Sequence, residues 1–207
     1  NKKFIKLGIL IFWMAVWQVI YMAVGNDILV VSPAMCFSTL IKFFSQGSFW
    51  NTVFLSLTRI CSGYILALVV GVILAGLACS TNLIYDLLQP IMVIVKATPV
   101  ASFIILALLW INTDFVPVFI AFLMVMPMIY INVYNGIKQT DKKLLEMAKI
   151  FKFGKAKTLR LIYFPSVIPY FIPSATTALG FAWKSGVAAE VICTPKFSIG
   201  KAIYESK

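Results

Sequence analysis

Long apolar segments separated by short polar ones run through this chain of 207 residues. A helix needs about 20 apolar residues to cross the hydrocarbon core of a membrane, and several segments reach that length. The pattern predicts an all-α, polytopic membrane helix bundle with five spans, at residues 7–24, 54–79, 87–110, 115–134 and 166–193. Prolines within the last three spans are tolerable, because neighbouring helices can satisfy the carbonyls that proline leaves without a partner.

The first span follows three lysines, as the apolar part of a secretory signal peptide would, and 23–25 is a weak cleavage pattern. We favour a retained helix, because the apolar run is long for a signal peptide and further spans follow. Ser32 and Pro33 then mark the start of a shorter amphipathic helix that ends near Phe44. That helix is too short to cross a membrane, so we expect it at the outer surface.

The distribution of basic residues predicts the orientation of the spans. The segment 136–165 holds the densest group of them: Lys138, Lys142, Lys143, Lys149, Lys152, Lys155, Lys157 and Arg160. By the positive-inside rule this segment is cytoplasmic. The N-terminus is then also cytoplasmic, and the loops at 25–53 and 111–114 lie outside. Five spans place Lys207 outside as well, although the tail after Cys193 is basic.

Composition supports a membrane protein and excludes other classes. Hydrophobic residues make up 61% of the chain, charged residues 12%, and the mean hydropathy is +0.96, whereas soluble domains are nearer half apolar and a quarter charged. The formal net charge of +11 comes from the segments between apolar runs, so it does not indicate a nucleic-acid-binding surface. We expect a multi-pass protein of the inner (cytoplasmic) membrane, with no nucleic-acid partner.

The chain is poor in residues that catalyse reactions or bind metals. It has no histidine, and its seven acidic residues are scattered, so neither a metal site nor an acid–base pair is predicted. The four cysteines form no C-x-x-C pair: Cys36, Cys61, Cys79 and Cys193. The phosphate-binding pattern G-x-x-x-x-G-K-S/T is also missing. We expect no enzyme activity and no cofactor in this chain, with any ATP held by another subunit.

Two predicted spans carry small residues at four-residue spacing, which lets membrane helices pack closely. One series is Gly63, Ala67, Gly71, Ala75 and Cys79, and the other is Ser174, Ala178, Ala182 and Gly186. The second series ends at Glu190 and so directs a carboxylate into the bundle.

Charged residues within the predicted spans are few: Arg59, Lys96, Lys184 and Glu190. Each is costly in lipid unless it is paired or hydrated. Arg59 and Lys96 lie near helix ends, where we expect them to reach the membrane surface. Lys184 and Glu190 face different sides of one helix, so we expect them to meet other helices or line a wet cavity. Candidates for the translocation pathway are Arg59, Lys184, Gly186 and Glu190.

The cytoplasmic segment 141–165 has a helix–turn–helix pattern. Asp141 can cap a first helix, and Gly154 permits a turn before a second helix that ends as Pro165 starts the next span. The expected apolar face of the first helix is Leu144, Leu145, Ala148 and Phe151. A docking element and an amphipathic segment on the membrane surface fit this pattern equally well.

The same segment resembles the cytoplasmic motif E-A-A-x-x-x-G-x9-I-x-L-P of the permease subunits of binding-protein-dependent ABC importers. The matching positions are Glu146, Met147, Ala148, Ile162, Phe164 and Pro165. Lys152 stands at the glycine position and Gly154 follows two residues later, so we expect the turn to be shifted to Gly154.

Further matches, in the same order and spacing, resemble the nitrate/sulfonate/taurine branch of that family. They are Ser32-Pro33, 56–59, Gly63-Tyr64 and 182–190. The resemblance implies one permease domain over 1–207: an N-terminal helix and an outer amphipathic helix in 1–53, then a core in 54–207 that contains the coupling loop 141–165. It also implies a sixth helix after Lys207.

By this resemblance the chain would be the permease subunit of an ATP-driven importer, and would form a pathway for a small solute such as nitrate or a sulfonate by alternating access. The implied partners are a second permease copy (a homodimer), two cytoplasmic ATPase subunits and an extracytoplasmic solute-binding protein. Residues implied to couple the chain to the ATPase are Glu146, Met147, Ala148, Lys152, Gly154, Ile162 and Pro165. The alternative is an ATP-independent secondary transporter or channel, which needs ion-coupling carboxylates; Glu190 is the one candidate.

Overall fold

The computed structural model describes residues 2–26 and 29–205, and every regular element among them is a helix. This confirms the all-α class. The chain divides into two compact units, Asn1–Asn51 and Thr52–Lys207, which are treated separately below. The predicted outer position of Lys207 falls outside the described residues.

The first unit contains α1 (Lys2–Val24) and α2 (Pro33–Phe44). α1 is largely apolar, and none of the residues in its apolar window is buried, so most of its surface is suited to lipid. α2 begins as predicted, because the Ser32 hydroxyl accepts a hydrogen bond from the Met35 N–H at 3.2 Å. The Trp17 indole N–H donates to the Val31 carbonyl at 3.1 Å and ties α1 to the segment that precedes α2.

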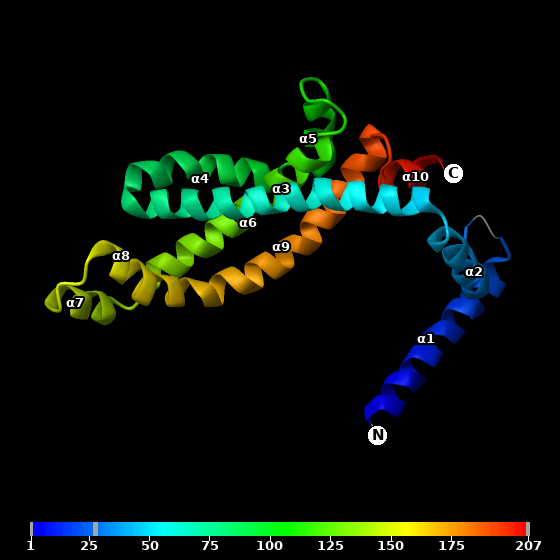
Figure 1. Ribbon diagram of the computed structural model, residues 1–207, viewed down its shortest axis with the longest axis horizontal. Coiled ribbons are helices and arrows are strands. Elements are labelled where there is room, and N and C mark those ends of the chain that lie inside the picture. The colour runs from blue at the N-terminus through cyan, green and yellow to red at the C-terminus, as the bar shows by residue number, and fades with distance from the viewer. Residues whose placement is uncertain (1, 27–28, 206–207) are drawn as a thin grey trace. The chain divides into compact units, whose positions relative to one another are not determined.

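Three long helices build the second unit: α3 (Gly47–Ser80), α6 (Val116–Lys138) and α9 (Phe164–Cys193). α6 and α9 form the most extensive helix pair, and Figure 1 shows them running side by side. The main core cluster draws buried residues from all three helices, including Ala67, Ile129 and Ala182. α6 is therefore the central helix, packed by α3 and α9.

Length and composition identify three helices that could cross a membrane, namely α1, α3 and α6, or four if the bent pair α4 (Asn82–Ala97) and α5 (Val100–Leu108) counts as one span. These helices match the first four predicted spans. α9 covers the fifth predicted span but is not among them. The five-span count is therefore not reached by these criteria in the described chain.

The third predicted span, 87–110, is not one straight helix. α4 and α5 meet at an angle of 101°. Pro99 has no N–H and disfavours helical geometry at Thr98, whose ψ is 135°. The Thr98 hydroxyl donates to the Ile94 carbonyl at 2.8 Å, which closes the end of α4. The pair is thus a broken span or a re-entrant hairpin.

The predicted small-residue series of α3 is a packing face. Gly63, Ala67, Gly71 and Ala75 are all buried. A methyl group at Gly63 would overlap the backbone carbonyl oxygen of Val118 on α6, so the absence of a side chain sets how closely these two helices approach. The series ends on Ala78, which is buried, and not on Cys79, which is partly exposed.

The series of α9 is also buried, from Ser174 through Ala178, Ala182 and Gly186 to Glu190. A Cβ added at Gly186 would lie 2.6 Å from the Ile60 side chain on α3. The small residues therefore bring α9 close to α3 near its C-terminal end, where Glu190 lies.

Substituting Gly63 by alanine should destabilise the bundle by about 1–3 kcal/mol, because the new methyl group forces α3 away from the α6 backbone. The matched control is Gly76→Ala in the same helix, where an added Cβ meets nothing within 4 Å. Thermal unfolding in detergent micelles measures both. Equal stability of the two variants would contradict the close α3–α6 packing.

Candidate functional site

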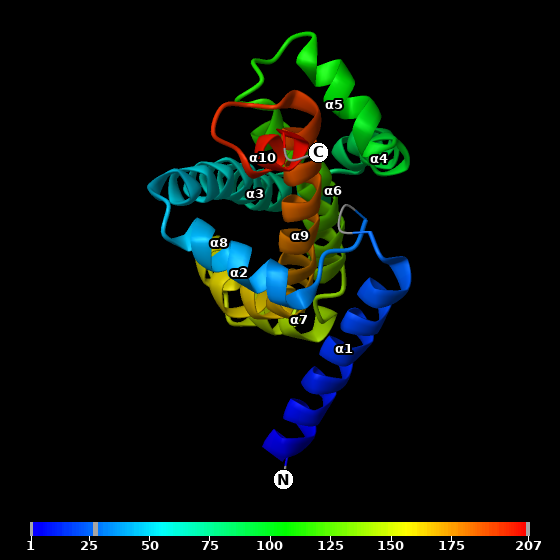
Figure 2. The same cartoon turned by 90° about the vertical axis from the view of Figure 1, so that its right-hand side faces the viewer.

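The carboxylate of Glu190 is fully buried at the end of the small-residue face of α9. The Ser56 hydroxyl on α3 donates to its Oε2 at 2.8 Å, and the Gly200 N–H donates to the same oxygen at 3.1 Å. Gly200 belongs to α10 (Ile199–Glu205), which lies against the end of α9 in both views (Figure 1, Figure 2). Any side chain at Gly200 would overlap Glu190. Glu190 therefore joins α3, α9 and α10.

Arg59 on α3 supplies the opposite charge. Its Nη1 lies 3.9 Å from Oε1 of Glu190, an oxygen that receives no hydrogen bond from the described residues. Its Nη2 forms a 2.9 Å ion pair with Asp114 in the loop between α5 and α6. The Arg59 side chain is only 14% exposed. Arg59 is therefore held by two carboxylates within the chain, one of them in the loop between α5 and α6.

The turn between α9 and α10 is held by the same residues. Arg59 donates to the carbonyls of Lys196 and Phe197 at 3.1 and 3.3 Å, and the Ile199 N–H donates to the Ser56 hydroxyl at 2.9 Å. Thr194 and Phe197 both adopt left-handed conformations, with φ of 46° and 50°, which cost roughly 1–2 kcal/mol per residue without glycine. Hydrogen bonds from α3 thus keep a strained turn in place.

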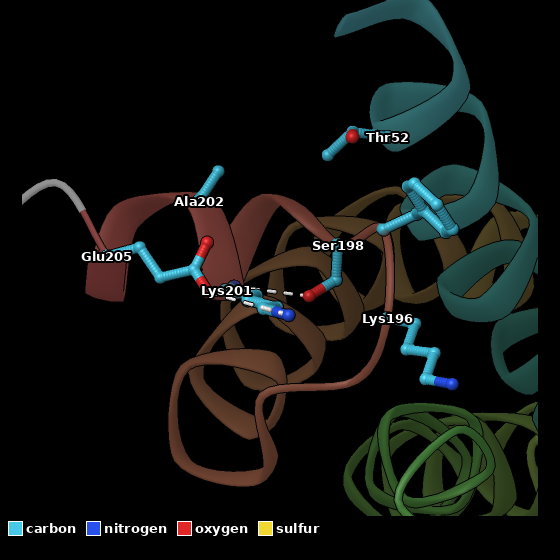
Figure 3. Close-up of a pocket in the computed structure, with 7 residues that line it drawn as sticks. Thr52, Lys196, Ser198, Lys201, Ala202 and Glu205 are labelled. Carbon is cyan, nitrogen blue, oxygen red and sulfur yellow. Dashed lines mark hydrogen bonds and ion pairs between the residues drawn. The ribbon is translucent and has the colours of Figure 1, made fainter. Parts of the chain in front are cut away.

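A surface groove of about 370 Å³ opens beside this turn (Figure 3). Its lining residues are Thr52, Lys196, Phe197, Ser198, Lys201, Ala202 and Glu205. Lys201 forms a 3.4 Å ion pair with Glu205 one turn away, and the Lys201 N–H donates to the Ser198 hydroxyl at 3.1 Å. Lys201 is therefore bound to residues of α10 and of the turn that precedes it.

The predicted coupling segment lies at the other end of α9 from α10 (Figure 1). Its first helix is α7 (Lys142–Ile150), and the Asp141 carboxylate accepts a hydrogen bond from the Lys143 N–H at 2.8 Å, as expected for a cap. The expected single apolar face is divided in two. Leu145 and Ala148 face the chain and help to line a cleft with Tyr163. The exposed apolar residues are Leu144, Met147, Ile150 and Phe151.

The turn after α7 is not shifted to Gly154. Lys152 adopts the left-handed conformation itself, with φ of 51°, whereas Gly154 has an ordinary φ of −66°. The Phe153 N–H donates to the Ala148 carbonyl at 2.8 Å and the Lys152 N–H donates to the Lys149 carbonyl at 3.0 Å. This is the Schellman arrangement that ends many helices, with lysine where glycine is usual.

The second helix of the segment is not separate from the next one. α8 (Lys155–Thr158) continues through a π-helical turn (Leu159–Tyr163) directly into α9. Pro165 has no N–H and its ring needs room, which the wider π turn provides. The Ser166 hydroxyl donates to the Ile162 carbonyl at 2.7 Å and satisfies one of the carbonyls in that turn. α7 therefore packs against the start of one long continuous helix.

Two candidate residues have no partner in the described part of the chain. Glu146 is exposed on α7, without an ion pair or hydrogen bond to a described residue. Lys184 is exposed on α9, and its side chain likewise has no ion pair or hydrogen bond to a described residue. Lys96 is exposed in the last turn of α4, as expected for a residue near a helix end.

The candidate residues thus form two groups at opposite ends of α9: the coupling segment, and the cluster around Glu190. Sequence reasoning did not identify Ser56, Asp114 or Gly200 as members of the second group. The spacing of Ser56 and Arg59, one helical turn apart, is a signal that they share a face. No local signal indicates that Asp114 and Gly200 meet them, because those contacts come from the chain's tertiary path.

Comparison with known proteins agrees with a membrane transport component. The chain belongs to the family of binding-protein-dependent transport system inner membrane components, whose model matches residues 67–205. The resemblance suggested by the cytoplasmic motif is thereby confirmed, and the chain is an ABC importer permease of the nitrate, sulfonate and bicarbonate type.

Three relatives show how far the similarity extends. The nitrate import permease protein NrtB of Synechocystis sp. is 27% identical over 189 residues, which cover 86% of this chain and 68% of the relative. The bicarbonate transport system permease protein CmpB of Synechococcus elongatus is 27% identical over 164 residues, covering 78% and 58%. The putative aliphatic sulfonates transport permease protein SsuC of Bacillus subtilis is 28% identical over 185 residues, covering 86% and 66%. The matched region is therefore 58–68% of the length of these relatives.

Replacing Glu190 by leucine should destabilise the bundle by about 3–5 kcal/mol, because the buried Arg59 charge loses a partner and two donors lose their acceptor. Glu190→Gln should cost less, since its amide oxygen can still accept from Ser56 and Gly200. Glu205→Gln is the control, because its ion pair is exposed and contributes about 0–1 kcal/mol. The measurement is thermal unfolding in detergent. A Glu190→Leu variant as stable as Glu205→Gln would show that the cluster does not stabilise the bundle.

Replacing Lys152 by glycine should stabilise the end of α7 by about 1 kcal/mol, because glycine adopts the left-handed conformation without steric cost. Lys152→Ala removes the same charge but keeps the backbone strain, so it should give no gain. Hydrogen exchange at the Phe153 amide, measured by mass spectrometry, is expected to slow about five-fold in Lys152→Gly. Unchanged exchange in that variant, or an equal effect of Lys152→Ala, would argue against a strained turn.

Proposed function

We propose that this chain is the permease subunit of an ATP-driven importer and that a separate cytoplasmic ATPase drives it through α7. The observation that supports this most directly is the docking face of α7, which we define as Leu144, Met147, Ile150 and Phe151. These side chains recur at helical spacing, and two of them, Ile150 and Phe151, are 78% and 69% exposed. Glu146 lies one turn before Ile150 at the edge of this face.

The surroundings of the docking face favour a protein partner. The neighbouring positions on α7 and α8 carry Lys142, Lys143, Lys149, Lys155 and Lys157, so the segment belongs on the cytoplasmic side by the positive-inside rule. A helix with an uncovered apolar face in water is typically laid into an apolar groove of another protein. The partner groove that fits is apolar, with a basic group opposite Glu146.

Continuous packing offers a route from this partner to the pathway. The inner face of α7 lines a cleft together with Tyr163 of the π-helical turn, and that turn continues into α9 up to Glu190. A displacement of α7 by the ATPase therefore shifts the start of a helix whose other end carries the buried charge cluster. This coupling supports alternating access, in which the bundle opens to one side of the membrane at a time.

The remaining partners follow from the family and the relatives. We propose a homodimer of this chain with the N-terminus cytoplasmic, two ATPase subunits inside and a solute-binding protein outside. α9 serves as an additional span at the pathway. The relatives are named for nitrate, bicarbonate and aliphatic sulfonates, so the proposed solute is a small anion. An ion-driven transporter would need an accessible carboxylate, whereas Glu190 is fully buried and bound by three partners.

Truncation of Glu146 to alanine should weaken ATPase association by about 2–5 kcal/mol, because a basic group in the partner groove would be left desolvated and unpaired. Lys155→Ala, on the basic side of the same segment, is the control and should change association little. Pull-down of the ATPase and solute-stimulated ATP hydrolysis in reconstituted vesicles measure the two effects. Normal coupling in Glu146→Ala with loss in Lys155→Ala would mean that another face of the segment binds the ATPase.

A further inference from the structure

Lys184 lies on a side of α9 that the described chain leaves uncovered. The packed face of α9 runs through Ala178, Ala182 and Gly186, and Lys184 is two residues from Ala182, so it points to the opposite side of the helix. Three small residues share its side and are exposed with it: Thr177, Gly180 and Ala188. This uncovered face therefore combines one cation with small side chains, next to the exposed ring of Phe181.

Lipid is a poor cover for this face. Lys184 lies nine residues before the end of α9 at Cys193, which is about 14 Å along the axis, so its charge is more than two turns from the helix end. A lysine at that depth is costly in hydrocarbon. α9 is also not among the helices that are apolar enough to be identified as spans.

The other two cations predicted to lie within spans are either paired or close to a helix end. Arg59 is bound to Glu190 and Asp114, and Lys96 lies in the last turn of α4 beside the break at Pro99. Of the cations within the predicted spans 54–79, 87–110, 115–134 and 166–193, Lys184 is the one in a helix interior whose side chain has no ion pair or hydrogen bond to residues 2–26 and 29–205. The charge presented on the uncovered face of α9 is positive, and the space beside it suits a small anion.

We infer that Lys184 is an anion-binding residue of the translocation pathway, with its ammonium group donating hydrogen bonds to an oxyanion beside Gly180 and Ala188. This inference rests on the proposed function, since it takes the uncovered face of α9 to line the solute pathway. A charge-assisted bond of this kind is short and strong. Because a single lysine makes it and the neighbouring side chains are small, the anion can still dissociate and continue along the pathway.

The test measures the charge and the water access beside Lys184 and does not require transport. Ala188→Cys, one turn from Lys184, serves as the reporter in a chain whose four native cysteines are replaced by serine or alanine. Anionic and cationic thiosulfonate reagents of equal size are compared in membranes. We expect the anionic reagent to react about ten-fold faster, and the ratio to fall to near one with Lys184→Met but not with Lys184→Arg. Leu179→Cys, exposed on another side of α9, should react with neither charged reagent.

Equal rates with both reagents at Ala188→Cys, or reaction only with a lipid-soluble maleimide, would overturn the inference. A second arm uses the assembled transporter with its ATPase and binding protein, and nitrate, bicarbonate and methanesulfonate as probe anions. Lys184→Met should lower uptake of the transported probe about ten-fold or more, and Lys184→Arg should retain it; full uptake by Lys184→Met would also refute the role. Failure of the proposed function is distinguishable, because the wild-type chain would then bind no ATPase while the reagent preference persisted.

Discussion

A carboxylate that is removed from water must be given partners, and in this bundle the burial of Glu190 determines which segments meet. Ser56 and Gly200 donate to one of its oxygens, and Arg59 lies near the other. Those partners come from α3 and from α10, and Arg59 adds the α5–α6 loop through Asp114. Because an unpaired buried charge costs several kcal/mol, none of these segments can move away from α9 independently. The close approach also explains why Gly186 and Gly200 have no room for side chains.

The two ends of α9 satisfy their groups in different ways. At the Glu190 end, partners within the chain bind one carboxylate oxygen of Glu190 and the carbonyls of the strained turn after α9. At the α7 end, apolar side chains and Glu146 are left without partners among the described residues. One continuous helix with a π-helical turn joins the two. Such an arrangement suits a subunit that receives a displacement from another protein at one end and responds at the other.

Much of the fold was predictable because its causes are local. Apolar run length predicted α1, α3 and α6, four-residue spacing predicted the packed faces of α3 and α9, and the Asp141 cap marked the start of α7. The features that the sequence did not predict have non-local causes or depend on backbone geometry. The 101° break follows from the extended backbone at Thr98 before Pro99, and the Arg59 partners depend on where the turn after α9 returns.

The motif in segment 141–165 illustrates what the sequence could predict and what it could not. Its residues identified the family, which the match over residues 67–205 confirms. Yet the glycine two positions after the expected site suggested a shifted turn, whereas Lys152 itself takes the left-handed conformation. Hydrogen bonds to the carbonyls of Ala148 and Lys149 hold that geometry, so the backbone keeps the turn in place against the side chain's preference.

The central claim, that ATP hydrolysis on a partner subunit drives import through this chain, is tested most directly by its energy source. The chain, its ATPase and its solute-binding protein would be reconstituted in vesicles and supplied with nitrate, bicarbonate or methanesulfonate. We expect accumulation of one of these solutes that requires ATP on the ATPase side and persists when ionophores collapse all ion gradients. Accumulation without ATP that vanishes with the ion gradient would contradict the account and establish a secondary transporter.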